Sequence, residues 1–490
     1  MPSAMARKAD VRKVKDYERR RPERTLLYQL IEEYYPRFRE LLGTQGRSLP
    51  AYVRREFDDF LKCGILEHGF LRVRCQDCHD ERLVAFSCKR RGFCPSCGAR
   101  RMVESAALLV DEVLPHLPMR QWVLSFPFQL RFLFASRPEI MSRVLGLVYR
   151  AIETHLIQQA GCTRATAKTG AVTLIQRFGS ALNLNIHFHM LFLDGVYLTG
   201  REQPVFRRLP APRPQALEQL IQTISQRVGA FLEREGLLVR DIENTYLQLD
   251  PSDDSALNDL LGHSITYRIA VGPQAGRKAF TLQTVPAREE DRDNSQLAKT
   301  AGFSLHAGVA AKAHQRRKLE RLCRYIARPA VATDRLALTP QGNVRYTLKT
   351  PYRDGTTHII LEPLDFIARL AALVPKPRVN LTRFHGVFAP NSTLRHHVTP
   401  AGRAKRRLDE TKTPAQRRAA MTWAQRLKRV FKIDIETCDQ CGGTVKVIAC
   451  IEDPAVVKRI LDYLQKRLES NATPTHPARA PPAAAQRDGS

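Results

Sequence analysis

The sequence predicts an α+β fold, because its strand-like and helix-like segments do not alternate regularly, as they would in a parallel α/β sheet. Two strand-like segments, AVTLIQRF (171–178) and NIHFHMLFLDGVYL (185–198), follow one another across a short polar stretch. Segments with the period of an amphipathic helix lie elsewhere, at 26–42, 141–159, 216–236 and 312–328.

Shorter segments predict the remaining elements. QWVLSFP (121–127) and SLHAGV (304–309) favour strands, and residues 343–363 predict a hairpin around an Arg-Asp-Gly turn. EPLDFIARLAALVP (362–375) predicts a helix that ends at its proline, and Pro329 should end the helix of 312–328 in the same way. The low-complexity tail after Ser470 predicts disorder.

The charge balance indicates nucleic acid as a partner. Lys and Arg exceed Asp and Glu by 29 over 490 residues, an excess that most often serves phosphate binding. The sequence contains no apolar stretch of about 18 residues, so no membrane span is predicted. The N-terminus lacks the apolar segment of a secretory signal. We therefore expect a cytoplasmic protein without membrane contact, whose eleven cysteines are reduced thiols or metal ligands.

The cysteine spacing Cys75-x2-Cys78-x15-Cys94-x2-Cys97 predicts a structural zinc site with four thiolates. The alternative, a set of free structural cysteines, explains two CxxC turns less well. Cys63, His68 and Cys88, with His79 nearby, are left over and are candidate ligands of a second zinc. Cys438 and Cys441 form half of a further zinc site, or an unmetallated turn, because no second CxxC follows them.

The pair His187 and His189 lies in an apolar run. Alternation puts both imidazoles on one face of a strand, with Ile186 and Phe188 on the other face. Buried imidazoles need a partner, which is either a hydrogen bond or a metal ion. Gln176, near the end of the preceding strand, can add an amide oxygen, and such a mixed set suits Mg²⁺ or Mn²⁺ as a Lewis acid.

Tyr325 lies on the predicted basic helix, close to its apolar stripe of Leu319, Leu322 and Ile326. One interpretation is a phenol at the edge of the core with its hydroxyl in water. The other is a nucleophile that attacks a phosphodiester and becomes a phosphotyrosine, aided by nearby cations. Those cations on the same helix face are His314, Lys318, Arg321 and Arg328, of which the last three are candidate phosphate contacts.

Together these features resemble the HUH (His-hydrophobic-His) nucleases, and among them the rolling-circle insertion-sequence transposases with an N-terminal zinc-binding domain. The resemblance spans most of residues 50–450. The stretches that carry it are SCKRRGFCPSCGARR (87–101), LIQRFGSALNLNIHFHMLFLDGVY (174–197), RYIARPAVATDRL (324–336), residues 348–392 and WAQRLKRVFKIDIETCDQCGG (423–443).

The resemblance implies a central antiparallel sheet flanked by helices, with His187 and His189 as metal ligands and Tyr325 as the nucleophile. Gln176 matches the glutamine of a Gln-x-x-Gly stretch in related enzymes and would be the third ligand. The implied protein is a bacterial transposase, nucleoid-associated when bound to DNA, that binds single-stranded or hairpin element ends and target DNA. It would nick and rejoin them through a 5′-phosphotyrosine with Mg²⁺ or Mn²⁺.

One departure from some relatives concerns the nucleophile. They carry two tyrosines a helical turn apart, whereas here the neighbouring turns hold Arg321 and Pro329. We therefore expect a single-tyrosine cycle or a homodimer. The expected domains are a basic helical segment (1–48), the zinc-binding domain (49–105), the nuclease domain (106–335), the C-terminal part of the core (336–400), a basic helix with a CxxC segment (401–470) and a disordered tail (471–490).

Two other functions fit part of the pattern. A zinc-containing DNA-binding regulator would need the charge and the cysteines, but neither the histidine pair nor Tyr325. A plasmid-type replication initiator or relaxase would share the nuclease core. The basic run at 401–432 fits all three, because it is expected to contact backbone phosphate.

Overall fold

The computed structural model describes residues 21–200, 203–240, 245–247, 256–285, 296–402 and 437–471. Helices and antiparallel strands are mixed along the chain, which confirms the α+β prediction. The chain forms two compact units. The first contains Pro22–Leu61 and Cys88–Ile435, and the second contains Lys62–Ser87 and Glu436–Ser490.

A six-stranded sheet forms the centre of the first unit, and every neighbouring pair in it is antiparallel. The histidine strand β6 lies inside this sheet, between β3 and β5. In sheet order the strands are β12 (Leu297–Thr300), β13 (Phe303–Ala311), β3 (Met119–Ser125), β6 (Leu184–Leu193), β5 (Gly170–Phe178) and β17 (Thr382–Gly386). The strands predicted at 121–127, 171–178, 185–198 and 304–309 are confirmed, although the third divides into β6 and β7 (Gly195–Leu198).

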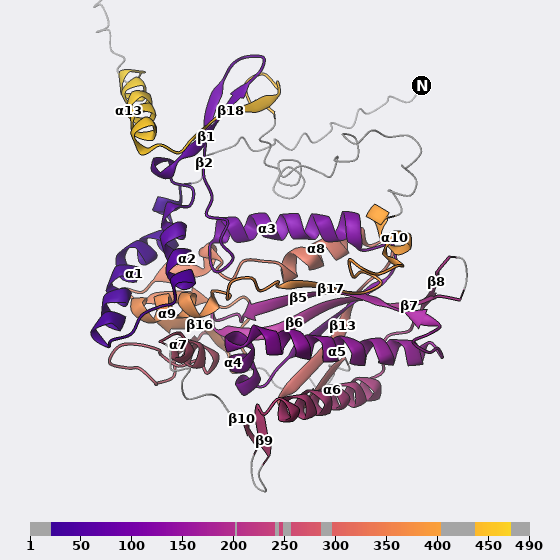
Figure 1. Cartoon of the computed structure of the whole chain (residues 1–490). Helices are drawn as coiled ribbons and strands as arrows, with labels where there is room; N and C mark the ends of the chain where they lie inside the picture. The colour runs from indigo at the N-terminus through magenta and orange to yellow at the C-terminus, as the bar shows by residue number, and fades with distance from the viewer. Residues whose placement is uncertain are drawn as a thin grey trace, which may run out of the picture. The chain divides into compact units, whose positions relative to one another are not determined.

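Helices cover both faces of this sheet (Figure 1). One face carries α4 (Phe128–Ser136), α5 (Pro138–Gln159) and α6 (Pro214–Arg234), and the other carries α3 (Pro95–Leu108) and α8 (Arg316–Ile326). Phe188 packs edge-on against Phe126 on the α4 side, with ring centroids 4.9 Å apart. Leu191 and Leu193 instead join the core cluster that contains Leu319 of α8, so the predicted alternation of β6 is confirmed.

A second group of elements in the first unit lies around α9 (Pro363–Leu373), which contacts α1 (Leu26–Thr44) and α7 (Ala256–Ile265). The predicted hairpin is confirmed as an antiparallel pair with its turn at Gly355, whose φ is +86°. It belongs to a sheet of β11 (Phe280–Gln283), β16 (Thr356–Leu361), β15 (Val344–Thr347) and β14 (Leu336–Leu338). The other elements are α2 (Ala51–Lys62), η3 (Leu109–Val113), β4 (Ala167–Lys168), β8 (Val205–Arg208), β9 (Leu238–Arg240), β10 (Thr245–Leu247) and α10 (Arg395–Val398).

The second unit contains a three-stranded antiparallel sheet of β18 (Val445–Ile451), β1 (Phe70–Cys75) and β2 (Glu81–Ala85). The middle strand β1 pairs with β2, which follows it directly, and with β18, which comes about 370 residues later in the chain. Helix α13 (Pro454–Asn471) follows β18 and contacts the short turn η2 (Leu66–His68). A sheet with this order requires the C-terminal segment of the chain.

One predicted boundary differs. The helix expected at 312–328 starts only at Arg316, because Lys312–Gln315 form a turn in which the backbone N–H of Lys312 donates to the Gln315 side chain. The helix ends at Ile326, three residues before Pro329. Most of the basic run at 401–432 and almost all of the tail lie outside the described residues, as do residues 1–20. No helix in the described part of the chain is long and apolar enough to cross a membrane.

Candidate functional site

The two histidines lie side by side on one face of β6. Their ring centroids are 4.8 Å apart, and both side chains are buried. The cross-strand partner of His187 on β5 is Gln176, so these two side chains leave the sheet on the same face. That face is the one covered by α8, the helix that carries Tyr325.

Each imidazole has a hydrogen-bond partner at Nδ1. Nδ1–H of His187 donates to the backbone carbonyl of Asn185 at 2.8 Å, and the side-chain amide of Gln121 lies 2.7 Å from Nδ1 of His189. A half-turn of that amide presents its oxygen as an acceptor, which leaves the lone pair of His189 on Nε2. Partners of this kind orient the ring of a metal-binding histidine.

The chemical state of the pair suits a metal ion. Burial lowers the pKa of His187 to about 4 and that of His189 well below 6.5, so both rings are neutral at pH 7. Nε2 of His189 is buried and has no hydrogen-bond partner among the described residues. A neutral imidazole with an unsatisfied nitrogen is the form that binds a divalent cation.

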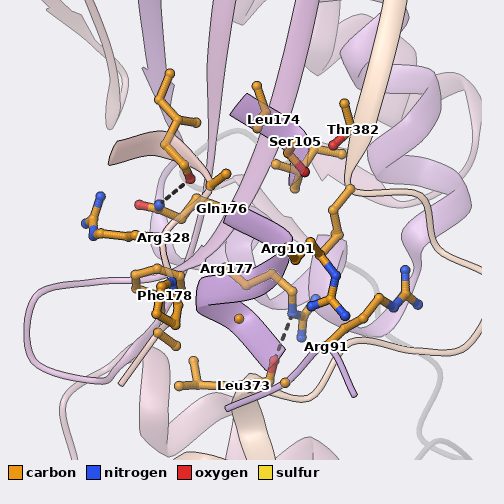
Figure 2. A pocket seen from close by; sticks show the side chains of 18 of the residues that line it. Arg91, Arg101, Ser105, Leu174, Gln176, Arg177, Phe178, Arg328, Leu373 and Thr382 are labelled. Carbon is orange, nitrogen blue, oxygen red and sulfur yellow. Dashed lines mark hydrogen bonds between the residues drawn. The ribbon is translucent and has the colours of Figure 1, made fainter. Parts of the chain in front are cut away.

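Gln176 connects the histidine strand pair to the tyrosine helix. Its amide Nε2 donates to the backbone carbonyl of Ile326, the last residue of α8, at 3.0 Å (Figure 2). With the nitrogen held there, the oxygen of the same carboxamide is the atom that can ligate a cation. The structure thus brings Gln176 to the face of the histidines and fixes it on the turn beside Tyr325.

Tyr325 lies in the last turn of α8 and is 40% exposed. Its ring centroid is 6.4 Å from that of His189, in an edge-to-face arrangement. Two cations lie over the phenol ring: Cζ of Arg328 at 4.2 Å and Nζ of Lys349 at 4.1 Å. An accessible phenol between a histidine pair and two cations has the surroundings that a nucleophile at a phosphodiester requires.

The other predicted phosphate contacts are placed differently. Lys318 and Arg321 are exposed on α8, two turns and one turn before Tyr325 respectively, whereas Arg328 contacts the tyrosine ring itself. His314 lies in the turn before the helix and is exposed. Lys318 and Arg321 therefore offer a basic surface that leads toward the phenol.

Two residues of this site are missed by sequence reasoning. Gln121 lies in β3, and nothing in QWVLSFP reveals that β3 is the neighbour of β6. Lys349 lies in the loop after β15, and no local pattern relates it to α8. A polar residue in an otherwise apolar strand is the one available signal for Gln121.

In the second unit the structure collects four cysteines that are far apart in sequence. Sγ of Cys75 lies 3.5 Å from that of Cys441, and Sγ of Cys78 lies 3.5 Å from that of Cys438. All four sulfurs are within 4.8 Å of one another. The backbone N–H of Cys78 helps to lower the pKa of the Cys75 thiol to about 7, toward the thiolate that binds zinc. The backbone N–H of Asp80 lowers the pKa of the Cys78 thiol, but the neighbouring thiols of Cys441 and Cys438 raise it by more, so Cys75 loses its proton first.

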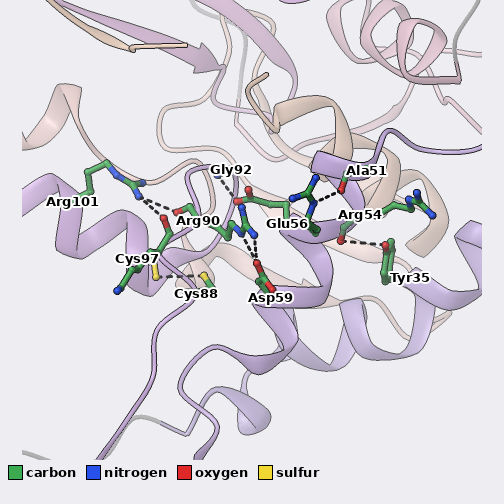
Figure 3. A network of polar contacts seen from close by, with 12 residues as sticks. Tyr35, Ala51, Arg54, Glu56, Asp59, Cys88, Arg90, Gly92, Cys97 and Arg101 are labelled. Carbon is green, nitrogen blue, oxygen red and sulfur yellow. Dashed lines mark hydrogen bonds and ion pairs between the residues drawn. The ribbon is translucent and has the colours of Figure 1, made fainter. Parts of the chain in front are cut away.

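In the first unit Cys88, Cys94 and Cys97 converge, with their sulfurs within 4.8 Å of one another. Sγ of Cys88 and Sγ of Cys97 are 3.5 Å apart (Figure 3). Cys94 immediately precedes α3 and Cys97 lies in its first turn, where the helix dipole favours a thiolate.

The structure therefore groups the cysteines differently from the predicted set of Cys75, Cys78, Cys94 and Cys97. The β1–β2 turn carries Cys75 and Cys78 to the C-terminal CxxC pair, a long-range contact that spacing cannot reveal. Of the remaining candidate ligands, Cys63 directly follows α2. His68 is exposed and belongs to no cysteine cluster in the described part of the chain.

Comparison with known families agrees with this picture. The family described as "Transposase zinc-binding domain" matches residues 30–126, and the family described as "Putative transposase" matches residues 170–395. The first match contains Cys63, Cys75, Cys78, Cys88, Cys94 and Cys97, and the second contains His187, His189 and Tyr325. No curated protein and no solved structure matches the chain.

The antiparallel sheet, the cysteine clusters and the two matches define a DNA transposase with a zinc-binding domain. More particularly, the chain belongs to the rolling-circle insertion-sequence transposases that carry this domain at the N-terminal end.

Proposed function

We propose that this transposase nicks and rejoins single-stranded DNA at the ends of its element, with Tyr325 as the nucleophile. The observation that carries the proposal is the partly exposed phenol of Tyr325, held 6.4 Å from the ring of His189 and beside two cations. The phenol oxygen attacks phosphorus, the P–O3′ bond breaks, and the 3′ oxygen leaves as a hydroxyl. The phenol proton passes to water, and the leaving 3′ oxygen takes a proton from water. Attack of a 3′-hydroxyl on the phosphotyrosine then reverses the exchange at a new junction.

The residues around Tyr325 hold the phosphate and its charge. Arg328 and Lys349 flank the phenol and stabilise the negative charge that builds up on phosphorus-bound oxygens. Lys318 and Arg321 contact phosphates of the incoming strand. His187, His189 and Gln176 would hold Mg²⁺ or Mn²⁺, which fits the neutral rings and the unsatisfied Nε2 of His189. When bound, the ion supplies Lewis-acid polarisation of the scissile phosphate.

The single tyrosine shapes the proposed cycle. Arg321 and Pro329 occupy the positions one turn away, where a second nucleophile would lie. Either one tyrosine acts twice in succession, or a second copy of the chain supplies the other nucleophile. We therefore propose either a single-tyrosine cycle or a homodimer for strand transfer.

Zinc has a structural role in this proposal. One ion would be held by Cys75, Cys78, Cys438 and Cys441, since four thiolates complete a tetrahedron and leave no open position. A second would be held by Cys88, Cys94 and Cys97.

A covalent-capture experiment tests the proposed function. Purified protein is incubated with end-labelled single strands from either end of the element, with Mg²⁺, Mn²⁺ or EDTA, and resolved on a denaturing gel. We expect a protein–DNA band with single strands and a divalent ion, and none with EDTA or with His187→Ala/His189→Ala. Tight binding without such a band on any strand would favour the DNA-binding regulator instead.

The role of Gln121 gives a separate prediction. Gln121→Leu removes the partner of His189 Nδ1 and should weaken Mn²⁺ binding roughly 10–100-fold, the usual cost of losing such a partner. Gln121→Glu keeps an acceptor oxygen at the same place and should bind Mn²⁺ almost as wild type does. Isothermal titration with Mn²⁺ measures both variants. Equal affinity of wild type and Gln121→Leu would contradict the assigned role.

A further inference from the structure

A cavity of about 300 Å³ in the first unit lies next to the candidate site and has no role in the chemistry described so far. Gln176, Ile326 and Arg328 line it and also belong to the surroundings of Tyr325, so the cavity adjoins the C-terminal end of the tyrosine helix. Figure 2 shows Arg91, Arg101 and Arg177 together on one side of it and Arg328 beside Phe178 on another. Its size is that of a small-ligand pocket.

The cavity is strongly positive. Arg90, Arg91, Arg101, Arg177 and Arg328 all line it, and none of its lining residues is Asp or Glu. Two carboxylates lie nearby. Asp59 pairs with Arg90, and Glu56 accepts a hydrogen bond from the backbone N–H of Gly92 at 2.6 Å (Figure 3). Glu56 also acts electrostatically on Arg91 and Arg101. Among the described residues, however, Arg91, Arg101 and Arg177 have no carboxylate within ion-pair distance.

Arg177 is the residue of the cavity that most favours the binding of an anion. Its side chain is only 7% exposed, and no carboxylate among the described residues pairs with it. It donates only long hydrogen bonds of 3.4 Å, to the carbonyls of Leu373 and Ala372 at the end of α9. A buried charge without a counter-ion is costly, and a bound anion would remove that cost.

The same walls are also partly apolar. Leu174, Phe178, Ile326 and Leu381 contribute carbon surface beside the guanidinium groups. Arg328 lies over the ring of Phe178, with Cζ 5.3 Å from its centroid, and over the ring of Tyr325. An anion with an attached apolar ring system matches this combination, since guanidinium groups bind phosphate in a forked geometry and stack on flat rings.

We propose that this cavity is a nucleotide subsite, in which Arg91, Arg101 and Arg177 bind the phosphate of a DNA nucleotide next to the one that Tyr325 attacks. The position of that nucleotide rests on the proposed function, because it is defined by the attack of Tyr325. The binding of phosphate in the cavity does not depend on the proposed function. A neighbouring phosphate held in the cavity would position the scissile phosphate at the phenol. The enzyme would then place the DNA strand through its sugar–phosphate backbone and not through its bases.

The first test measures binding without cleavage. A short fluorescent oligothymidylate is titrated separately with wild type, with Arg101→Gln and with Arg177→Gln. The titrations are repeated at several salt concentrations, without divalent ions. Each variant should bind roughly tenfold more weakly than wild type, as expected for a lost charge-assisted hydrogen bond. The log–log salt slope should fall by about 0.7 for one lost contact to single-stranded phosphate. Arg100→Gln is the matched control, because Arg100 lies on the same helix, pairs with Glu104 and does not line the cavity.

A structural role of these arginines gives a different pattern. Arg101 donates to the carbonyls of Lys89 and Arg90, and Arg91 donates to that of Val379, so each could simply fix a loop. In that case the melting temperature of the variants would fall while their salt slope stayed at the wild-type value, and the proposal would be overturned. If Arg177→Gln does not fold, Arg101→Gln and a further variant, Arg91→Gln, carry the test alone, because both positions are partly exposed.

The second test locates the nucleotide. Neutral methylphosphonates replace the phosphates of a cleaved strand one at a time, and binding is measured to wild type and Arg101→Gln. We expect wild type to lose affinity at a position flanking the cleavage point, and Arg101→Gln to lose none there. If no methylphosphonate position weakens binding to wild type without also weakening binding to Arg101→Gln, the subsite is overturned. A failure of the proposed function is a separate result, because it removes the covalent band and leaves the oligothymidylate titration unaffected.

Discussion

Tyr325→Phe should abolish the covalent protein–DNA band while single-strand binding stays close to that of wild type. The substitution removes the one atom that would form the bond to phosphorus and leaves the ring between Arg328 and Lys349 in place. Loss of a nucleophile typically costs 10⁴-fold or more, roughly 10⁶-fold in the best-studied case, so the band should fall below detection. Single-turnover gels over time, with equal DNA saturation of both proteins, measure the difference.

Two matched controls are available for this substitution. Tyr346 is buried, and its hydroxyl accepts from the backbone N–H of Ala332, whereas the hydroxyl of Tyr352 accepts from that of Ser180. Both phenols are engaged inside the fold, so Tyr346→Phe and Tyr352→Phe should still form the band. An adduct that survives in Tyr325→Phe but disappears in one of these two variants would move the nucleophile there.

Cys438→Ser/Cys441→Ser should reduce the zinc content from two ions to one per chain and unfold the second unit. Two thiolates cannot hold zinc with structural affinity, and a bound structural zinc contributes roughly 10–16 kcal/mol of binding free energy in small domains. The sheet around β1 has few other sources of stability, because its outer strand β18 has several exposed side chains. Elemental analysis of gel-filtered protein and limited proteolysis measure the two effects.

Cys450 provides the control for this prediction. It is exposed on β18, in the same sheet, but belongs to neither cysteine cluster in the described residues. Cys450→Ser should keep both zinc ions and the proteolysis pattern of wild type. If Cys438→Ser/Cys441→Ser also kept two ions, Cys75 and Cys78 would have other ligands, as the local spacing of the sequence predicts.

Much of the fold follows from local patterns. Alternation in NIHFHMLFLDGVYL correctly separates the face of the two histidines from that of Phe188, because the period of a strand does not depend on its neighbours. The Arg-Asp-Gly turn likewise marks the β15–β16 hairpin, since Gly355 adopts a positive φ there. Helix α8 is shorter than predicted, because hydrophobic periodicity does not detect a turn closed by a side chain.

Contacts between distant segments could not be predicted in this way. Gln121 reaches His189 because β3 pairs with β6, and Lys349 reaches Tyr325 from a loop beyond α8. The contact of Cys75 with Cys441 joins two segments that are 366 residues apart in the sequence. The first and the third of these contacts depend on the order of strands in a sheet, and the second depends on how a distant loop packs against α8. Short-range spacing encodes neither.

The pairing of β1 with β18 also has a consequence for the order of synthesis. Residues 70–75 leave the ribosome about 370 residues before their partner strand exists. At roughly 5–20 residues per second, this delay is on the order of tens of seconds. During this interval Cys75 and Cys78 lack half of their cluster, whereas Cys88, Cys94 and Cys97 already have one another. A transcript cut short between the codons for residues 386 and 438 would therefore encode every strand of the central sheet but never the completed second unit.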